Sequence, residues 1–256
     1  MSNINNITNI GGSNGASIGE LSPYSNEMFN DQWNLYQKVL SNNYMEHREI
    51  YGVLHEFLVS YFQKPFKMLE LGCGDASFSV QALLNTTITC YQGIDLSEVA
   101  LEIALNNMAL INCETSFTQG DFSELVPELV KSQPHDFDAI LASFTLHHLT
   151  LEQKDCIIGQ LSRLVKAGGV FILIDVVRRE AEDRDTYLKR YLDNLRQNWS
   201  ALTSQEIAMV EDHIYSSDFQ ETQKILYELG RKHNFIHFDC LYHDLLDTSQ
   251  VLCFYR

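Results

Sequence analysis

The feature that most constrains the fold of this chain is the stretch from Met68 to Ser77, which reads MLELGCGDAS. It begins as an apolar run, passes through Gly72 and Gly74, and leads into a helical pattern. Glycines permit positive φ values and let the backbone approach a ligand closely. A helix that follows directly offers unpaired N–H groups at its start. The stretch therefore predicts a strand, a turn and a helix, with the turn as a candidate ligand site.

The same alternation of strand and helix continues as far as residue 176. Strands are expected at 67–71, 88–94, 114–119, 137–142 and 170–176, and helices at 78–84, 97–108 and 151–164. Strands that alternate with helices long enough to cross over specify a doubly wound parallel sheet. In such sheets a ligand binds outside the carboxyl ends of the strands. The distinctive polar motifs of this chain fall at those ends, so the site is expected there.

An acidic residue ends the second predicted strand. Asp95 follows Gly74 by 21 residues, a spacing at which a carboxylate can accept hydrogen bonds from both hydroxyls of a ribose. The glycine turn and Asp95 together indicate an adenosine-type cofactor, although the turn alone would also suit a purely structural role. A dinucleotide site would place a third glycine at Ser77. It would also leave the carboxylate of Glu70 facing a phosphate, whereas a carboxylate there suits a cationic ligand.

With these motifs the chain resembles the class I S-adenosylmethionine-dependent methyltransferases over residues 65–176. The matching segments are ELGCG at 70–74, GIDLS at 93–97, QGDF at 119–122, FDAI at 137–140, LHHL at 146–149 and LVKAGG at 164–169. The resemblance implies an α/β, Rossmann-like doubly wound sheet of seven strands. In it the last strand, expected at 251–255, is antiparallel and lies between strands five and six. It also implies S-adenosyl-L-methionine as cofactor and S-adenosyl-L-homocysteine as product.

The resemblance further assigns roles to ten cofactor-binding residues. They are Glu70, Gly72, Cys73 and Gly74 at the methionine end, Asp95 at the ribose hydroxyls, Leu96, Asp121 and Phe122 around the adenine, and Ser143 and Phe144 beside the sulfonium and the acceptor.

The rest of the chain is expected to decorate this core within a single domain at 23–256. Residues 1–22 are rich in Asn, Ser and Gly, and such a composition predicts a disordered tail. Cap helices are expected at 23–64, a helical lid insert at 177–218, and the last helix with strands six and seven at 219–256. Aromatic residues of the first helices either line a substrate pocket or belong to the core; they are Tyr24, Phe29, Trp33, Tyr36 and Tyr44.

The insert ends in a dense polar segment, EDHIYSSD, at 211–218. We expect His213, Tyr215 and Asp218 to contact the acceptor, the alternative being that they solvate helix ends and that Asp218 caps the next helix. His148 of the His-His pair after strand four is a further catalytic candidate, because an acceptor hydroxyl or ammonium must lose a proton. Such pairs are, however, common in the family as packing structure.

No metal site is expected. The six cysteines form no CxxC pair, which argues against zinc and against a disulfide framework. At the end of strand four, the metal-binding aspartate of catechol-type enzymes is absent, as is the Asn/Asp-Pro-Pro-aromatic segment of enzymes that methylate planar nitrogens.

The net charge of the chain limits the partners that we expect it to bind. The formal net charge of −16 disfavours nucleic acid and membrane surfaces, and the lack of a leader or of a long apolar run predicts a cytoplasmic protein. We expect a methyltransferase, monomeric or homodimeric, that acts on a nitrogen or oxygen of a small molecule of specialised metabolism. An amine or cation is favoured by four carboxylates placed near the pocket, Asp175, Glu180, Asp212 and Asp218. The alternatives are a non-catalytic methyltransferase-like partner protein and an NAD-dependent oxidoreductase.

Overall fold

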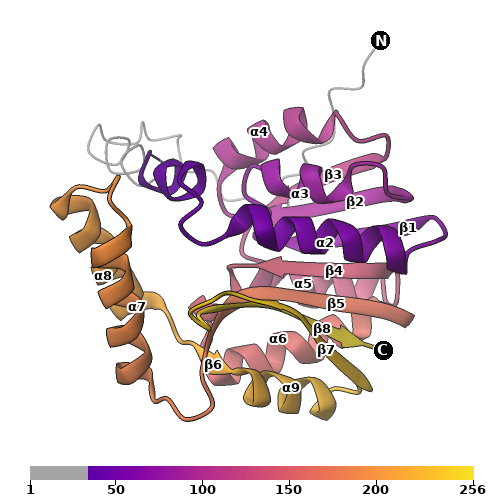
Figure 1. The fold of residues 1–256 in the computed structure, drawn as a ribbon. Coiled ribbons are helices and arrows are strands. Elements are labelled where there is room, and N and C mark those ends of the chain that lie inside the picture. The colour runs from indigo at the N-terminus through magenta and orange to yellow at the C-terminus, as the bar shows by residue number, and fades with distance from the viewer. Residues whose placement is uncertain (1–33) are drawn as a thin grey trace, which may run out of the picture.

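A central sheet organises the molecule (Figure 1), whose computed structural model describes residues 34–256. The strands follow the order β3-β2-β1-β4-β5-β8-β7, and a short β6 pairs with β5. They are β1 (Phe66–Leu71), β2 (Ile88–Asp95), β3 (Glu114–Gln119), β4 (Phe137–Ser143), β5 (Val165–Arg178), β6 (Glu221–Thr222), β7 (His237–His243) and β8 (Ser249–Tyr255). Strand β8 is antiparallel to both β5 and β7. The expected sheet is confirmed: the last long strand, β8, is antiparallel and lies between β5 and β7, which correspond to the expected strands five and six.

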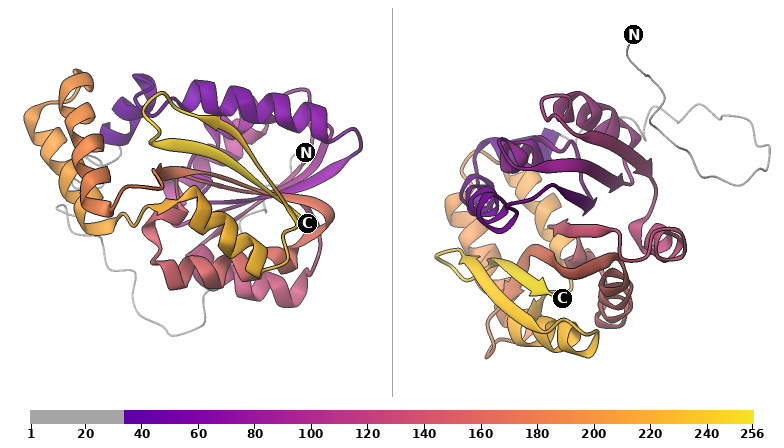
Figure 2. Two further views of the ribbon diagram at one scale, coloured as in Figure 1. Left: turned by 60° about the horizontal axis from the view of Figure 1, so that its bottom comes forward. Right: turned by 90° about the vertical axis from the view of Figure 1, so that its right-hand side faces the viewer.

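Helices cover both faces of this sheet (Figures 1 and 2). On one face lie α2 (His47–Tyr61), α3 (Ser77–Leu83) and α4 (Glu98–Met108), and on the other α5 (Phe122–Ser132), α6 (Leu151–Leu164) and α9 (Gln223–Lys232). Each face has its own apolar core against the sheet. Strand β5 is buried without a break from Val170 to Val177, as a parallel strand covered on both faces must be.

The insert between β5 and β6 forms a separate layer. It consists of α7 (Arg184–Asn198) and α8 (Ser204–Ser217), which stand beyond the carboxyl ends of the parallel strands (Figures 1 and 2). A helical segment at 34–41 packs on these two helices in a third core. The contact is reinforced by the stacked rings of Tyr44 and Trp199, 4.9 Å apart, and by a 2.5 Å ion pair between Lys38 and Glu206. This third core covers the edge of the sheet at which a ligand is expected.

Local sequence signals explain most helix boundaries. Ser97 caps α4 by accepting a hydrogen bond from the Ala100 N–H, and Thr150 and Thr203 open α6 and α8 with capping boxes. Helix α5 was not expected; it forms around Pro127 because Asp121 caps it and Val126 is buried beneath it.

Two expectations about the ends of helices and strands need correction, and a third concerns residues outside the described part of the chain. Helix α9 begins at Gln223 with Thr222 as its cap, so Asp218 is not the N-cap of that helix but ends α8. Strand β5 starts at Val165 rather than at 170, because the backbone pairs with β4 from Phe137 through an irregular register. The predicted tail at 1–22, and with it Tyr24, Phe29 and Trp33, falls outside the described residues. Within residues 34–256 every helix is too short or too polar to cross a membrane.

Candidate active site

The glycine turn follows β1 and has the backbone that its sequence requires. Gly72 and Gly74 have φ values of 65° and 52°, in the left-handed region that glycine adopts most easily. A Cβ atom on Gly72 would lie 2.6 Å from Oγ1 of Thr145, whereas one on Gly74 would have nothing within 4 Å. Gly72 is therefore fixed by packing against the segment after β4, and Gly74 borders open space.

Asp95 connects this turn to the start of the next helix. Its Oδ2 accepts a hydrogen bond of 2.8 Å from the Gly74 N–H, and its Oδ1 accepts one of 2.9 Å from the Ser97 N–H. A carboxylate oxygen has two lone pairs, so each oxygen can accept one further bond. The carboxylate thus holds the turn and can still receive two hydroxyl groups.

Glu70 lies beneath the turn and is 1% exposed. Its carboxylate accepts hydrogen bonds from the hydroxyls of Ser79 at 2.8 Å and Tyr91 at 2.6 Å. Burial raises the pKa of Glu70 to about 7. The two hydroxyl donors oppose this shift, whereas the negative charges of Asp95 and Asp75 add to it. The region is therefore suited to a ligand that brings positive charge.

A cavity of about 370 Å³ opens over these groups. Seven predicted cofactor residues line it: Glu70, Gly72, Cys73, Gly74, Asp95, Ser143 and Phe144. Four aromatic lining residues, Tyr36, His47, Tyr51 and Phe78, were not among the residues predicted to bind the cofactor. What these four residues share, and what could have identified them in the sequence, is an aromatic side chain on the first helices or at the start of α3.

The three residues assigned to the adenine lie outside this lining. Leu96 is exposed, Asp121 accepts a hydrogen bond from the Ser123 N–H as the cap of α5, and Phe122 packs against the core beneath α5 and α6. They lie beside Asp95 along the same edge of the sheet, because β2 and β3 pair in register up to Asp95 and Gln119. Their adenine role stays a prediction.

A second cavity of about 400 Å³ lies between the sheet edge and the insert. It shares Tyr36, Val39, Met45 and Phe144 with the first cavity. Most of its remaining wall is apolar or aromatic and includes Tyr187, Tyr191 and Trp199 of the insert. Phe144, at the junction, has a φ of 48°, in the left-handed region, which a bulky residue adopts only at an energetic cost.

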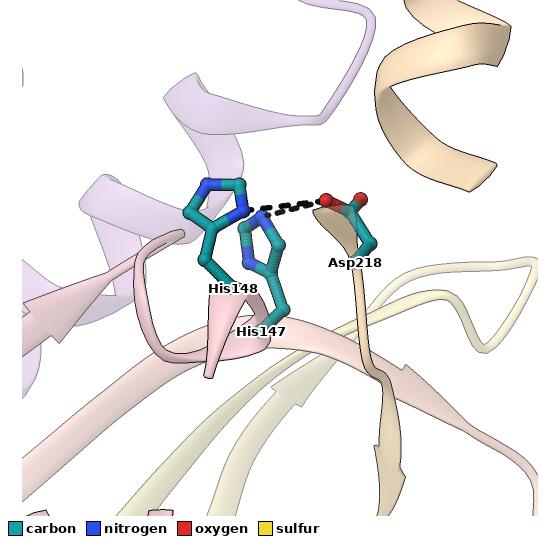
Figure 3. Close-up of side chains that lie close together, drawn as sticks. All are labelled: His147, His148 and Asp218. Carbon is teal, nitrogen blue, oxygen red and sulfur yellow. Dashed lines mark ion pairs between the residues drawn. The ribbon is translucent and has the colours of Figure 1, made fainter. Parts of the chain in front are cut away.

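One corner of the second cavity is polar (Figure 3). Oδ1 of Asp218 lies 3.3 Å from Nδ1 of His148 and 3.7 Å from Nε2 of His147. Nε2 of His213 is 3.8 Å from the same oxygen. The other ring nitrogen of His147, Nδ1, makes a 2.5 Å hydrogen bond to Oδ1 of Asp175. Burial alone lowers the pKa of His147, but the charges of Asp175 and Asp218 outweigh it and raise that pKa.

The predicted acceptor residues are therefore only partly brought together. His148, His213 and Asp218 line the second cavity, whereas Tyr215 is exposed and does not. His147, treated with its neighbour as packing structure, proves to be buried between two carboxylates. Asp175 lies inside β5 rather than at the end of the strand, so its carboxylate reaches His147 and not the cavity.

Comparison with known proteins now assigns the family. The family model for a methyltransferase domain matches residues 63–249, well over half of the chain. The chain belongs to the methyltransferase-domain family. The match contains the glycine turn, Asp95, the His-His pair and the insert, and it agrees with the class I S-adenosylmethionine-dependent fold described above.

Individual relatives agree with this assignment. An uncharacterized methyltransferase of Bacillus mycoides strain KBAB4 is 28% identical over 165 residues, which are 64% of this chain and 71% of the relative. Among solved structures, an O-methyltransferase family protein from Burkholderia thailandensis superposes with a TM-score of 0.56 at 13% identity, covering 81% of this chain and 55% of that one. A SAM-dependent methyltransferase from Methanosarcina mazei has a TM-score of 0.52 at 18% identity and covers 76% and 93%. At these identities the structures show the fold alone.

The buried carboxyl group of Glu70 makes a measurable pH dependence of stability. A folded-state pKa of about 7 exceeds the unfolded value of about 4.3, so the folded chain holds a proton that the unfolded chain has released. Between these two values the free energy of unfolding therefore falls as pH rises, by up to roughly 3 kcal/mol. Urea titrations of the ligand-free protein from pH 4.5 to 7.5 measure this fall.

Glu70→Gln is the matched variant, because glutamine keeps the shape of the side chain and carries no proton that titrates. Relative to the parent it should gain stability steadily over the same pH range and change little below it. Parallel stability curves for parent and variant would show that Glu70 is not the group responsible.

Proposed function

We propose that this protein is an S-adenosylmethionine-dependent methyltransferase that acts on a nitrogen or oxygen of a small, largely apolar molecule. The observation that carries the proposal is the junction of two cavities at Phe144: one lies over the glycine turn and Asp95, and the other beneath the insert. Such a junction allows two bound molecules to meet at one point, and holding reactants in contact supplies much of the acceleration of a transfer reaction.

The first cavity fits the cofactor in three respects. The turn presents Gly74 with no side-chain atom in the way, the carboxylate of Asp95 retains acceptor capacity for two ribose hydroxyls, and the buried Glu70 faces a cationic amino acid moiety. S-adenosylmethionine supplies an activated methyl group on a positively charged sulfur. Ser143, the last residue of β4, and Phe144, which follows it, both line the cavity, and we place them beside that sulfur.

The second cavity suits an acceptor of modest size. Its volume of about 400 Å³ lies in the range of small-molecule sites, and its aromatic wall favours an acceptor with an apolar or aromatic body. Asp218 is the one member of the four predicted pocket carboxylates that lines it. An amine is therefore favoured less strongly than the sequence indicated, and phenols are equally suitable. His148, His213 and Asp218 are the candidates for contact with the reacting end of the acceptor.

Two measurements test the proposal. Calorimetry with S-adenosylhomocysteine should show binding, and NAD should show none; the reverse result would favour an oxidoreductase, and neither binding would favour a non-catalytic partner protein. Methyl transfer from S-adenosylmethionine to a set of small phenols and aryl amines should then identify an acceptor.

Val210→Trp, on α8 in the wall of the second cavity, separates the two sites. The indole ring should fill the acceptor space, so we expect at least a tenfold fall in kcat/KM for the acceptor and S-adenosylhomocysteine affinity within about twofold of the parent. Val59→Trp, at an exposed position on α2, is the matched control and should change neither quantity. An unaltered kcat/KM in Val210→Trp would place the acceptor elsewhere.

A further inference from the structure

The polar corner of the second cavity contains an unsatisfied buried carboxylate oxygen. Asp218 is 6% exposed, and its Oδ1 accepts no hydrogen bond from any of the residues 34–256. Leaving a buried charged acceptor without a hydrogen bond costs more than the usual 1–3 kcal/mol of a neutral group unless a positive charge faces it. An oxygen in this position therefore calls for a positively charged partner.

Three imidazole nitrogens face that oxygen, yet none forms a hydrogen bond to it; Nδ1 of His148 instead donates to the Ser217 carbonyl at 3.4 Å, through a proton that metal binding would displace. The distances from Oδ1 are 3.3 Å to Nδ1 of His148, 3.7 Å to Nε2 of His147 and 3.8 Å to Nε2 of His213. The ligand atoms of His147, His148 and Asp218 all lie within 4.8 Å of one another, and these three side chains point toward a common centre (Figure 3).

These separations match those between the ligands of one metal ion. A tetrahedral site with bonds of about 2.1 Å to nitrogen and oxygen has edges of about 3.4 Å between its ligand atoms. The three nitrogen–oxygen distances around Asp218 differ from that edge by a few tenths of an ångström. The ligand nitrogens of His147 and His148 lie within 4.8 Å of each other, so an ion could enter once the histidine rings rotate toward the common centre.

The surroundings of His147 reinforce this interpretation. Its Nδ1–H donates to Asp175 over 2.5 Å, and Asp175 is itself held by the Val176 N–H at 2.9 Å. This leaves Nε2 directed at Asp218. Metal-bound histidines characteristically donate their second ring nitrogen to a carboxylate, which fixes the ring and makes it a better ligand. Because Asp175 lies in the central strand β5, the ring is held by the most rigid part of the fold.

We propose that His147, His148 and Asp218 bind a divalent transition-metal ion, with His213 as a fourth ligand. Three imidazoles and one carboxylate suit Zn²⁺ first and Co²⁺, Fe²⁺ or Mn²⁺ next. His213 is more exposed than the other three and is the ligand that an incoming group can displace. Where the proposed methyl transfer holds, that position lets the ion bind the acceptor's oxygen or nitrogen at the end of the second cavity.

The sequence disfavours a metal site because it contains no CxxC pair and no aspartate at the end of strand four. The ligands proposed here come instead from the segment after β4 and from the end of α8, 70 residues apart. The 2.7 Å hydrogen bond from the Phe219 N–H to the His147 carbonyl holds these two segments together.

Zn²⁺ titration of the full-length protein after chelator treatment tests the site without cofactor or acceptor. Calorimetry should show one equivalent of Zn²⁺ bound with micromolar or tighter affinity. Asp218→Asn should weaken this binding at least 100-fold, and Asp175→Asn, which acts through the orientation of His147, about 10- to 100-fold. His213→Ala, at an exposed position that folding does not require, should weaken it about tenfold.

Asp155→Asn is the matched control, since Asp155 also pairs with a histidine, His233 at 2.8 Å, but is satisfied by that bond and by Lys232. Its Zn²⁺ affinity should equal that of the parent. Co²⁺ provides a second readout, because a tetrahedral site with these ligands gives an intense visible absorption that Asp218→Asn should abolish. Equal Zn²⁺ binding by the parent and by Asp218→Asn, or none by the parent, would overturn the site while leaving the proposed methyl transfer untouched.

Discussion

Asp95→Ala is expected to weaken S-adenosylhomocysteine binding by about 100-fold or more. The carboxylate of Asp95 is positioned by the Gly74 and Ser97 N–H groups and, in the proposed complex, accepts both ribose hydroxyls. Hydrogen bonds to a charged group contribute about 1.5–3 kcal/mol each, and 1.4 kcal/mol corresponds to a factor of ten in affinity. The variant loses the ribose contacts and the tie that holds the turn. Calorimetry with S-adenosylhomocysteine measures the change.

Asp138→Ala is the control variant that separates the loss of ligand contacts from the loss of a structural hydrogen bond. Asp138 also accepts a backbone hydrogen bond, from the Lys67 N–H at 2.9 Å, and it pairs with Lys166. It lies at the start of β4 and does not line either cavity. We expect this variant to lose some stability and to bind S-adenosylhomocysteine like the parent. If both aspartate variants bind equally well, the assignment of Asp95 to the ribose is wrong.

Lys154→Met is expected to lower the free energy of unfolding by about 3 kcal/mol, as is typical when one partner of a buried ion pair is removed. Lys154 is 2% exposed on α6, where its ammonium donates to the Phe219 carbonyl and lies 3.4 Å from Oε1 of Glu221. Methionine keeps the length of the side chain but leaves both oxygens without this donor. Urea denaturation at neutral pH measures the loss.

Lys232→Met is the matched control. Lys232 pairs with Asp155 at 2.5 Å, but its side chain is 60% exposed, and exposed ion pairs are worth about 1 kcal/mol or less. Adding Glu221→Leu to Lys154→Met should recover part of the lost stability, because the carboxylate that has lost its buried lysine and keeps only Arg178 at 3.8 Å is then removed as well. Similar losses of unfolding free energy in the two lysine variants would show that burial does not make the ion pair of Lys154 contribute more than an exposed one.

Lys154 also links stability to the candidate site. The residues that it holds, Phe219 and Glu221, lie one and three residues after Asp218. We therefore expect Lys154→Met to weaken Zn²⁺ binding as well, whereas Lys232→Met should not, and the titration described above detects the difference.

The parallel core of the fold could be predicted from the sequence because its signals are local. The run into Gly72, the acid at position 95 and the apolar strand that ends near Val176 each depend on a few consecutive residues, and the structure places them as expected. Helix α5 was missed for the same reason. Pro127 interrupts the local pattern, and the burial of Val126 and Val130 that supports the helix is a tertiary contact.

The second cavity and its polar corner depend on the tertiary structure. Its wall joins Leu35 and Met45 from the start of the chain to Trp199 of the insert, and no periodicity relates positions so far apart. From its sequence context His147 is not distinguishable from a packing residue; what distinguishes it is the position of its ring between Asp175 and Asp218 in the folded chain.

By itself, then, the sequence determined the α/β core and the glycine turn with Asp95, because backbone geometry and strand order follow from neighbouring residues, and it predicted a cofactor of adenosine type. The tertiary structure decided the position of the second cavity, in which we place the acceptor, and the burial of one oxygen of Asp218 that accepts no hydrogen bond from residues 34–256. The physical reason is that a cavity and an unsatisfied charge arise from what surrounds a residue in space, and those surroundings come from segments that the chain brings together only when it folds.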